Sequence, residues 1–273
     1  MNRLVFSPEL SYVIGVRFGD GSPNVNRKRG SYGLELAVTD YDFVKEFDRC
    51  LCLAVGKSTE YSIFEVKGRD PRYKKMWKVV GYSKLLIELL DGSWKDVVEN
   101  YPAPFVRGIG DSEGSPINHT SRQAPNIYIE NTNLGLLQYV QGILHELMIE
   151  SRIHPTNRKG DRKTFVFKKN CYRLAICQFD SVQKYAHKIG FSIQRKQSKL
   201  EHLIEKKELL VKRGRNYPKH IHGHRKLSKD QEIGVVQSRA NGLRVKELAY
   251  YFSVSERTIR RTLERLSKNN IER

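Results

Sequence analysis

Strand-like and helix-like patterns of apolar residues follow one another twice along the chain. Apolar and polar residues alternate at Leu34, Leu36 and Val38, as in a half-buried strand, and again around Ile127 and Ile129. After each strand, apolar residues recur at helical spacing, as Phe43, Val44, Phe47 and Leu51 and then as Leu136, Leu137, Val140 and Leu144. A second strand followed by a helix is predicted in each copy, at about 77–90 and 172–190. The pattern therefore predicts two copies of one unit of mixed strands and helices.

The two copies align without gaps when the sequence is shifted by 93 residues. Tyr12-Val13-x-Gly15 then meets Phe105-Val106-x-Gly108, and Asp20-Gly21-Ser22-Pro23 meets Glu113-Gly114-Ser115-Pro116. A chain built from two such copies is a pseudo-dimer. Its approximate twofold symmetry suits a target that has its own twofold, such as duplex DNA.

Each copy opens with a short predicted helix that carries glycine on one face and ends near an acid. Gly15 and Gly108 allow two helix backbones to pack closely, which would bring Asp20 and Glu113 together at the helix ends. Two carboxylates beside negative helix ends are unfavourable without a cation. A divalent metal removes that cost and gains oxygen ligands.

These duplicated motifs resemble the LAGLIDADG family of homing endonucleases, over residues 10–205 or so. The resemblance implies an α+β fold of tandem αββαββα half-domains, a pseudo-dimer whose saddle-shaped antiparallel sheets lie in the DNA major groove. It also implies Mg²⁺ at the interface of the two motif helices and cleavage of both strands across the minor groove. Carried onto this sequence, Asp20 and Glu113 become the catalytic metal ligands, and the carbonyls of Gly19 and Ser112 become further ligands. Asp111 aligns with Phe18, so we interpret it as a polar interface residue.

The sequence departs from the family pattern just past the second strand of each half. Active members often carry a lysine or glutamine there, near the scissile phosphate. Here these positions read Thr39-Asp40-Tyr41 and Asn131-Thr132-Asn133. Lys168 and Lys169 could supply positive charge from another direction.

Strand alternation also predicts the residues on the open, DNA-facing side of each sheet. If Leu34, Leu36 and Val38 face the core, then Gly33, Glu35 and Ala37 face outward, and an inward Val25 would place its neighbours outward too. The predicted DNA-binding side chains are Asn24, Asn26, Lys28 and Glu35 in the first copy, and His119, Ser121, Gln123 and Tyr128 in the second, with Glu130 on the same face.

The formal net charge of +19 is concentrated near the C-terminus. Residues 1–194 hold 28 lysines and arginines against 21 acids, a net of +7, whereas residues 195–273 hold 21 against 9, a net of +12. Such density indicates a polyanionic partner, because binding phosphates releases counterions. A basic helix on a membrane surface is the alternative, but residues 195–215 offer only scattered leucines for a lipid-facing side.

After half-domains at 1–100 and 101–205, we expect a basic linker at 206–226 and a helical module at 227–273. A capping box begins at Ser228, and a tight turn at Phe252-Ser253-Val254-Ser255 precedes a basic helix. This module resembles a helix-turn-helix of the resolvase or sigma-factor kind. Its predicted DNA-binding residues are Ser255, Arg257, Thr258, Arg260 and Arg261.

Other features of the chain exclude some functional classes. Its four cysteines form no C-x-x-C pair, which favours free thiols over a zinc site. No apolar run approaches the roughly 18 residues of a membrane span, and the first residues are too short and polar a stretch for a signal peptide, so we expect a cytoplasmic protein.

The sequence therefore predicts a monomeric, homing-type, site-specific endonuclease of double-stranded DNA that hydrolyses phosphodiester bonds with Mg²⁺. Two alternatives stay open, a transcription regulator with a LAGLIDADG-like domain and an intron maturase. The presence of both acids favours the nuclease. The missing lysine favours the regulator.

Overall fold

The computed structural model describes residues 4–66, 74–119, 124–156, 170–212, 227–252 and 254–269. The chain divides into two compact units, with the main boundary after Ile204. Five residues singled out in the sequence lie outside the described residues: Ser121, Gln123, Lys168, Lys169 and Ser253.

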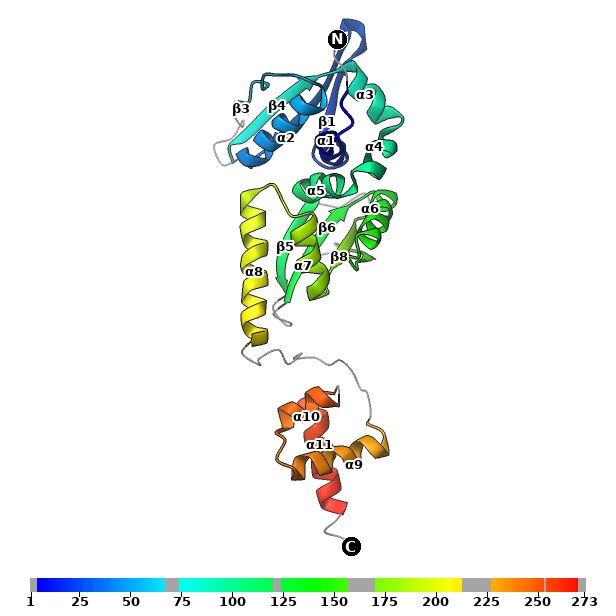
Figure 1. The fold of residues 1–273 in the computed structure, drawn as a ribbon, viewed down its shortest axis with the longest axis vertical. Coiled ribbons are helices and arrows are strands. Elements are labelled where there is room, and N and C mark those ends of the chain that lie inside the picture. Colours follow the sequence, from blue (N-terminus) through cyan, green and yellow to red (C-terminus); the bar gives the residue numbers. More distant parts are fainter. Residues whose placement is uncertain are drawn as a thin grey trace, which may run out of the picture. The chain divides into compact units, whose positions relative to one another are not determined.

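The first unit contains the predicted αββαββα arrangement twice (Figure 1). The first half consists of α1 (Pro8–Phe18), β1 (Ser22–Asn26), β2 (Ser31–Val38), α2 (Tyr41–Ala54), β3 (Phe64–Val66), β4 (Met76–Tyr82) and α3 (Lys84–Asp91). The second consists of α5 (Pro102–Glu113), β5 (Gly114–His119), β6 (Ala124–Asn131), α6 (Leu134–Glu146), β7 (Arg152–Pro155), β8 (Tyr172–Ile176) and α7 (Phe179–Lys188). Two further helices, which the apolar pattern did not lead us to predict, are α4 (Trp94–Asn100) and α8 (Gln194–Lys212). The α+β fold class is confirmed.

Each half forms one four-stranded sheet, in the order β1-β2-β4-β3 and β5-β6-β8-β7. The number of residues that separates equivalent positions of the two halves is not constant along the chain. Leu36 pairs with Val79 in the first sheet, whereas its equivalent Ile129 pairs with Leu174 in the second. The offset is thus 93 residues for the first strand of each pair and 95 for its partner. Two additional residues between these strands leave the pairing register unchanged.

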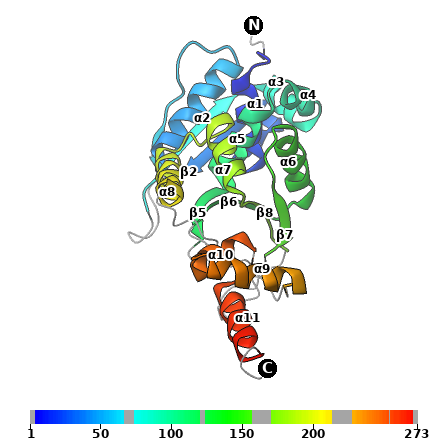
Figure 2. The ribbon, with the colours of Figure 1, turned by 60° about the horizontal axis from the view of Figure 1, so that its bottom comes forward.

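One face of each sheet packs against the helices, and the other is open (Figure 2). Leu34, Leu36, Ile127 and Ile129 are fully buried, as their alternation predicts. Val25 pairs with Tyr32 and so lies on the same face of the sheet as Leu34 and Leu36, as expected, but all of β1 is exposed and Val25 keeps 37% of its surface. Strand β1 is an edge strand with a single neighbour, so alternation there does not report burial.

Lys28 also departs from its expected place on a strand. It lies in a single 3-10 turn, η1 (Arg27–Arg29), which connects β1 to β2. Asn26 caps this turn by accepting the Arg29 N–H at 3.2 Å, and Gly30 closes it in the left-handed conformation at φ 64°. Lys28 is therefore an exposed residue at the tip of a hairpin.

Helices α1 and α5 pack side by side where the two halves meet (Figure 1). A Cβ atom on Gly15 would lie 2.2 Å from the Phe105 carbonyl oxygen, and one on Gly108 would lie 2.4 Å from the Tyr12 carbonyl oxygen. Only glycine permits this approach of the two backbones. The close approach fixes the position of both helix ends.

Helix α8 continues to Lys212, through the first residues of the predicted basic linker. Leu200 and Leu203 lie in the first half of this helix and are buried. The remaining predicted linker residues, 213–226, lie outside the described residues.

The second unit has three described helices around a small apolar cluster that includes Val235, Leu248 and Ile259. They are α9 (Lys229–Ala240), α10 (Val245–Tyr251) and α11 (Glu256–Asn269). The predicted capping box is present, since Ser228 Oγ accepts the Gln231 N–H at 3.2 Å and Gln231 Oε1 accepts the Ser228 N–H at 3.1 Å. Ser255 caps α11 in the same way through the Thr258 N–H.

The four cysteines are free thiols, with Cys50 and Cys52 buried within α2. Across the described part of the chain, no helix combines the length and the apolar character that crossing a membrane requires.

Candidate functional site

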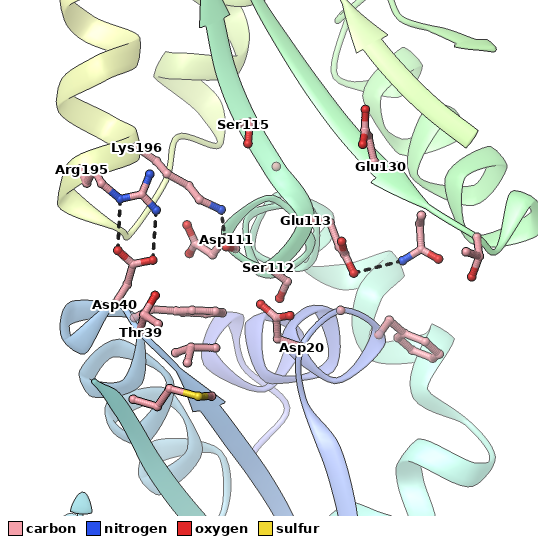
Figure 3. Close-up of a pocket in the computed structure, with 18 of the residues that line it drawn as sticks. Asp20, Thr39, Asp40, Asp111, Ser112, Glu113, Ser115, Glu130, Arg195 and Lys196 are labelled. Atoms are coloured by element: carbon pink, nitrogen blue, oxygen red, sulfur yellow. Dashed lines mark hydrogen bonds and ion pairs between the residues drawn. The ribbon is translucent and has the colours of Figure 1, made fainter. Parts of the chain in front are cut away.

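The two motif acids lie beside each other at the ends of α1 and α5. A Cβ atom on Gly19 would lie 2.2 Å from Ser112 Cβ, so the two helix ends are in contact just before the acids. Asp20 and Glu113 both line a cavity of about 790 Å³. Figure 3 shows their side chains on either side of Ser112, facing the same space.

Burial and mutual repulsion favour the protonated form of these acids. Burial raises the pKa of Glu113 to about 7, the negative charge of Asp20 adds to the shift, and the positive charge of Lys196 opposes it. Burial also raises the pKa of Asp20, again against the charge of Lys196. A divalent cation between the two carboxylates would reverse this balance, since it favours their ionised forms.

The predicted backbone ligands Gly19 and Ser112 also line the cavity. The Ser112 hydroxyl is used within α5, where it donates to the Gly108 carbonyl at 3.0 Å. At the edge of the cavity, Asn131 Nδ2 donates to Glu113 Oε1 over a long 3.5 Å. The carboxylates of Asp20 and Glu113 therefore form few hydrogen bonds with the described side chains.

A buried lysine that the sequence reasoning missed lies on the wall of this cavity. Lys196, in the first turn of α8, is only 7% exposed. Its Nζ donates to the carbonyls of Gly110, at 3.2 Å, and Asp111 in the last turn of α5 (Figure 3). These carbonyls lie at the negative end of the helix. Burial lowers the pKa of Lys196, while the nearby Asp111 and Asp20 raise it.

The same turn of α8 also binds the first half. Arg195 forms a two-pronged ion pair with Asp40, through Nε at 3.2 Å and Nη2 at 3.0 Å. The Gln194 N–H donates to Asp42 Oδ2 at 2.6 Å. The beginning of α8 therefore connects the β2–α2 junction of the first half with α5 of the second.

A sequence signal for Lys196 does exist. Ile193, Lys196, Leu200 and Leu203 are all buried and follow one another at spacings of three or four. Lysine at an apolar position of a helical pattern is unusual and indicates a polar partner inside the protein. The pattern cannot say which partner.

Asp111 is a buried interface residue, as predicted. It accepts hydrogen bonds from the Tyr12 hydroxyl, at 2.9 Å, and from the Ser192 N–H, at 3.0 Å. Burial raises the pKa of Asp111, and these bonds oppose the rise. The residue joins α1 to α5 and the segment before α8.

The open face of the first sheet carries polar residues brought together by the strand register. Asn24 pairs with Gly33, and Asn26 with Ser31, which places both asparagines on the same face as Glu35. Asn24 Nδ2 donates to Glu35 at 3.0 Å. Glu35 also pairs with Lys78 of β4 at 2.7 Å, a residue that the sequence reasoning did not select.

The open face of the second sheet is built in the same way. Tyr128 pairs with Ala175, and Glu130 with Arg173. The Arg173 guanidinium lies 4.4 Å from the Tyr128 ring centre and also binds Glu130. His119 is the last residue of β5. Arg173, on the neighbouring strand β8, was also missed.

The exposed side of α11 is basic. Arg257 and Arg261 are exposed, and Arg260 pairs with Glu256 at 3.5 Å. The predicted DNA-binding residues Ser255 and Thr258 hydrogen-bond to each other through their hydroxyls at 2.8 Å.

A duplicated αββαββα fold with paired acids at the ends of its interface helices is the architecture of a LAGLIDADG protein. The LAGLIDADG-like domain family matches residues 100–190, and the DeoR-like helix-turn-helix domain family matches residues 234–273. The uncharacterized protein MJ0398 of Methanocaldococcus jannaschii is 36% identical over 207 residues, which cover 73% of this chain and 72% of that protein. The chain belongs to the LAGLIDADG family and carries a DeoR-like helix-turn-helix domain at its C-terminal end.

Solved structures share the fold at low sequence identity. The homing endonuclease I-DmoI in complex with DNA and Ca has a TM-score of 0.52 and 20% identity, covering 72% of this chain and 98% of that one. The homing endonuclease I-WcaI bound to its DNA recognition sequence has a TM-score of 0.50 and 12% identity, covering 72% and 88%. The fold is therefore that of homing endonucleases.

Proposed function

We propose that this chain is a metal-dependent endonuclease of double-stranded DNA, with Asp20 and Glu113 as the catalytic metal ligands. The observation that carries the proposal is the convergence of these two acids, one from each half, in a single cavity. The raised pKa of Glu113, about 7, supports it, because perturbed acids gather at functional sites.

The donor set fits a hard divalent cation such as Mg²⁺. This ion commonly binds one or two carboxylates, substrate phosphates and several waters. Within the described residues, no group of three or more His, Cys, Asp or Glu side chains is placed to hold a metal ion, and we assign the cation to the two carboxylates of Asp20 and Glu113. The carbonyls of Gly19 and Ser112 are candidate additional ligands. A bound cation would lower the pKa of a water and neutralise charge on the phosphate.

The residues of the chain then divide the work. Asp20 and Glu113, in their ionised forms, hold the cation between the halves. The open faces of the two sheets supply donors and acceptors for base edges, which would make cleavage site-specific. Arginines on α11 bind further DNA phosphates. One chain contains both halves, so a monomer suffices for two strand cuts, as in a homing-type enzyme.

The test uses duplex DNA of randomised sequence, with Mg²⁺ or Mn²⁺ against EDTA, and sequencing of the cut ends. Glu113→Gln and Asp20→Asn should each abolish metal-dependent cleavage and retain binding of the recovered site in a gel shift. The loss should be large, because a ligand of the metal acts on the transition state more than on binding. Glu60→Gln, at an exposed acid, is the matched control and should cut normally. Normal cleavage by both active-site variants would refute the proposed role of the acids.

A DNA-binding regulator is the second candidate. The DeoR-like match and the absence of lysine or glutamine after β2 and β6 support it. A regulator would bind a specific duplex, cut none with any divalent metal, and bind equally well as Glu113→Gln. That combination of results would replace the endonuclease with the regulator.

A further inference from the structure

The first turn of α8 breaks the pseudo-twofold symmetry of the acid cavity. The two halves each contribute one acid, related by the 93-residue repeat. Helix α8 follows the second half, whereas after the first half the chain continues through α4 into α5. Arg195 and Lys196 of α8 line the cavity, and the described lining contains no equivalent pair from the first half.

The ends of the equivalent strands β2 and β6 also differ chemically. Past β2, Asp40 is held by Arg195. At the end of β6, Asn131 instead donates to the acid Glu113. Among the described residues that line the cavity, Arg195 and Lys196 are the only basic ones. Positive charge at this site thus comes from one element alone.

The two cations differ in how much of their charge is already neutralised. Arg195 is bound by a carboxylate through two nitrogens. Lys196 instead donates to two neutral carbonyls of α5, and an ammonium has three donors. These two partners carry no charge, and the carboxylates of Asp111, Asp20 and Asp40 act on Lys196 without a hydrogen bond to it. Its buried stem and its two bonds hold it in place beside the acids.

We propose that Lys196 faces a scissile phosphate in this cavity and that, because α8 supplies it once, the two DNA strands are cut at unequal rates. This inference rests on the proposed endonuclease function. In the hydrolysis, a water oxygen bonds to phosphorus and the bond from phosphorus to one deoxyribose oxygen breaks. One water proton goes to that leaving oxygen, and the other stays on the new phosphate monoester or passes to solvent. Lys196 transfers no proton and stabilises charge on the non-bridging phosphoryl oxygens.

The first measurement needs no variant. The native full-length chain is given Mg²⁺ and its recovered duplex with each strand labelled at its own 5′ end, so that the two rate constants are read separately. We expect one strand to be cut faster, and a supercoiled plasmid carrying the site to pass through a nicked circle before it becomes linear. Equal rate constants for the two strands would overturn the inference while leaving the proposed function in place.

The second measurement assigns the difference to Lys196. Lys196→Gln should slow the faster strand by about a hundredfold, the scale of removing one electrostatic interaction from a transition state, and the slower strand much less. Lys196→Arg keeps the charge and should restore most of the rate. Lys199→Gln removes the same charge from an exposed position of α8 and is the matched control. An equal slowing of both strands by Lys196→Gln would overturn the assignment.

A binding readout separates phosphate contact from a loss of folding. Binding is measured in Ca²⁺, so that the duplex stays uncut. If a protein cation contacts a given phosphate, ethylation of that phosphate weakens binding. One phosphate on one strand should interfere with the native chain and with Lys199→Gln, and cease to interfere with Lys196→Gln. An interference pattern unchanged by Lys196→Gln would overturn the inference. A native chain that binds its site and cuts neither strand would overturn both the proposed function and the inference.

Discussion

Gly15 and Gly108 face each other where α1 packs against α5, with the ideal Cβ position of Gly15 only 3.1 Å from the Gly108 Cα atom. This contact sets the distance between the two helix backbones. The acids follow it at the helix ends, so the geometry of the candidate metal site depends on two residues that have no side chain.

Gly15→Ala should therefore destabilise the protein. The added methyl would lie 2.2 Å from the Phe105 carbonyl oxygen, and the backbones would have to move apart. Overpacking of this kind costs about 1–3 kcal/mol. Gly142→Ala is the control, because a Cβ there meets nothing within 4 Å and alanine favours a helix interior by about 1 kcal/mol. Guanidinium unfolding measures both, and a Gly15→Ala protein as stable as the native chain would contradict the close packing of α1 and α5.

The raised pKa of Glu113 predicts a pH dependence of stability in metal-free protein. Its pKa rises from 4.5 in the unfolded chain to about 7 in the fold, so the folded state binds the extra proton between these values. The free energy of unfolding should consequently fall as pH rises from about 4.5 through 7. The charged neighbours that set this shift are Asp20, Glu130 and Lys196.

Glu113→Gln should remove this part of the pH dependence and leave the remainder. The contribution of Glu113 is isolated by comparing the melting temperatures of native and variant protein at about pH 5 and about pH 8, on either side of the raised pKa. The variant should gain most in relative stability at the higher pH. Added Mg²⁺ should stabilise the native chain more than the variant at the higher pH, because a bound ligand favours the folded state. A constant difference between the two proteins across this pH range would contradict the assignment.

The C-terminal unit should contribute much of the electrostatic binding to DNA. Deleting residues 216–273 should weaken duplex binding and flatten its salt dependence, yet leave cleavage detectable at high protein concentration. Within the full chain, Arg257→Ala with Arg261→Ala should reduce the slope of log K against log salt by up to about 0.9 for each phosphate that the protein no longer neutralises. Arg239→Ala removes one charge from α9 instead and should change the slope less. An unaltered slope in the truncated chain would show that this unit binds another partner.

The capping box at Ser228 should stabilise α9 in the full-length chain. Ser228→Ala removes the acceptor of the Gln231 N–H, and the removal of such a cap costs about 1 kcal/mol. Amide exchange in peptides from 229–240 should then quicken by roughly fivefold, the factor that corresponds to that energy. Ser238→Ala, inside the same helix, should not accelerate exchange, because alanine is the better helix former. Equal exchange in native and Ser228→Ala protein would mean that the cap contributes nothing to α9.

The sequence alone predicted the duplicated fold and the candidate acid pair. Both follow from local or repeated information. Alternation at Leu34 and Leu36 reports a buried strand face, and the register of Asp20 with Glu113 needs only the comparison of one half with the other. At Val25 alternation gave the correct face of the sheet but not burial, because the whole edge strand β1 is exposed.

Only the tertiary structure decided the charge balance of the cavity. The bond from Lys196 to the Asp111 carbonyl joins residues 85 positions apart, and the pair between Arg195 and Asp40 joins residues 155 positions apart. Helical periodicity could mark Lys196 as buried, but it carries no information about which distant backbone lies opposite. The sequence therefore determined which residues fill each half, because local patterns encode the strands, helices and repeat. The packing of α8 across both halves determined where the cations of the site come from, because that contact depends on the folded positions of segments far apart in the chain.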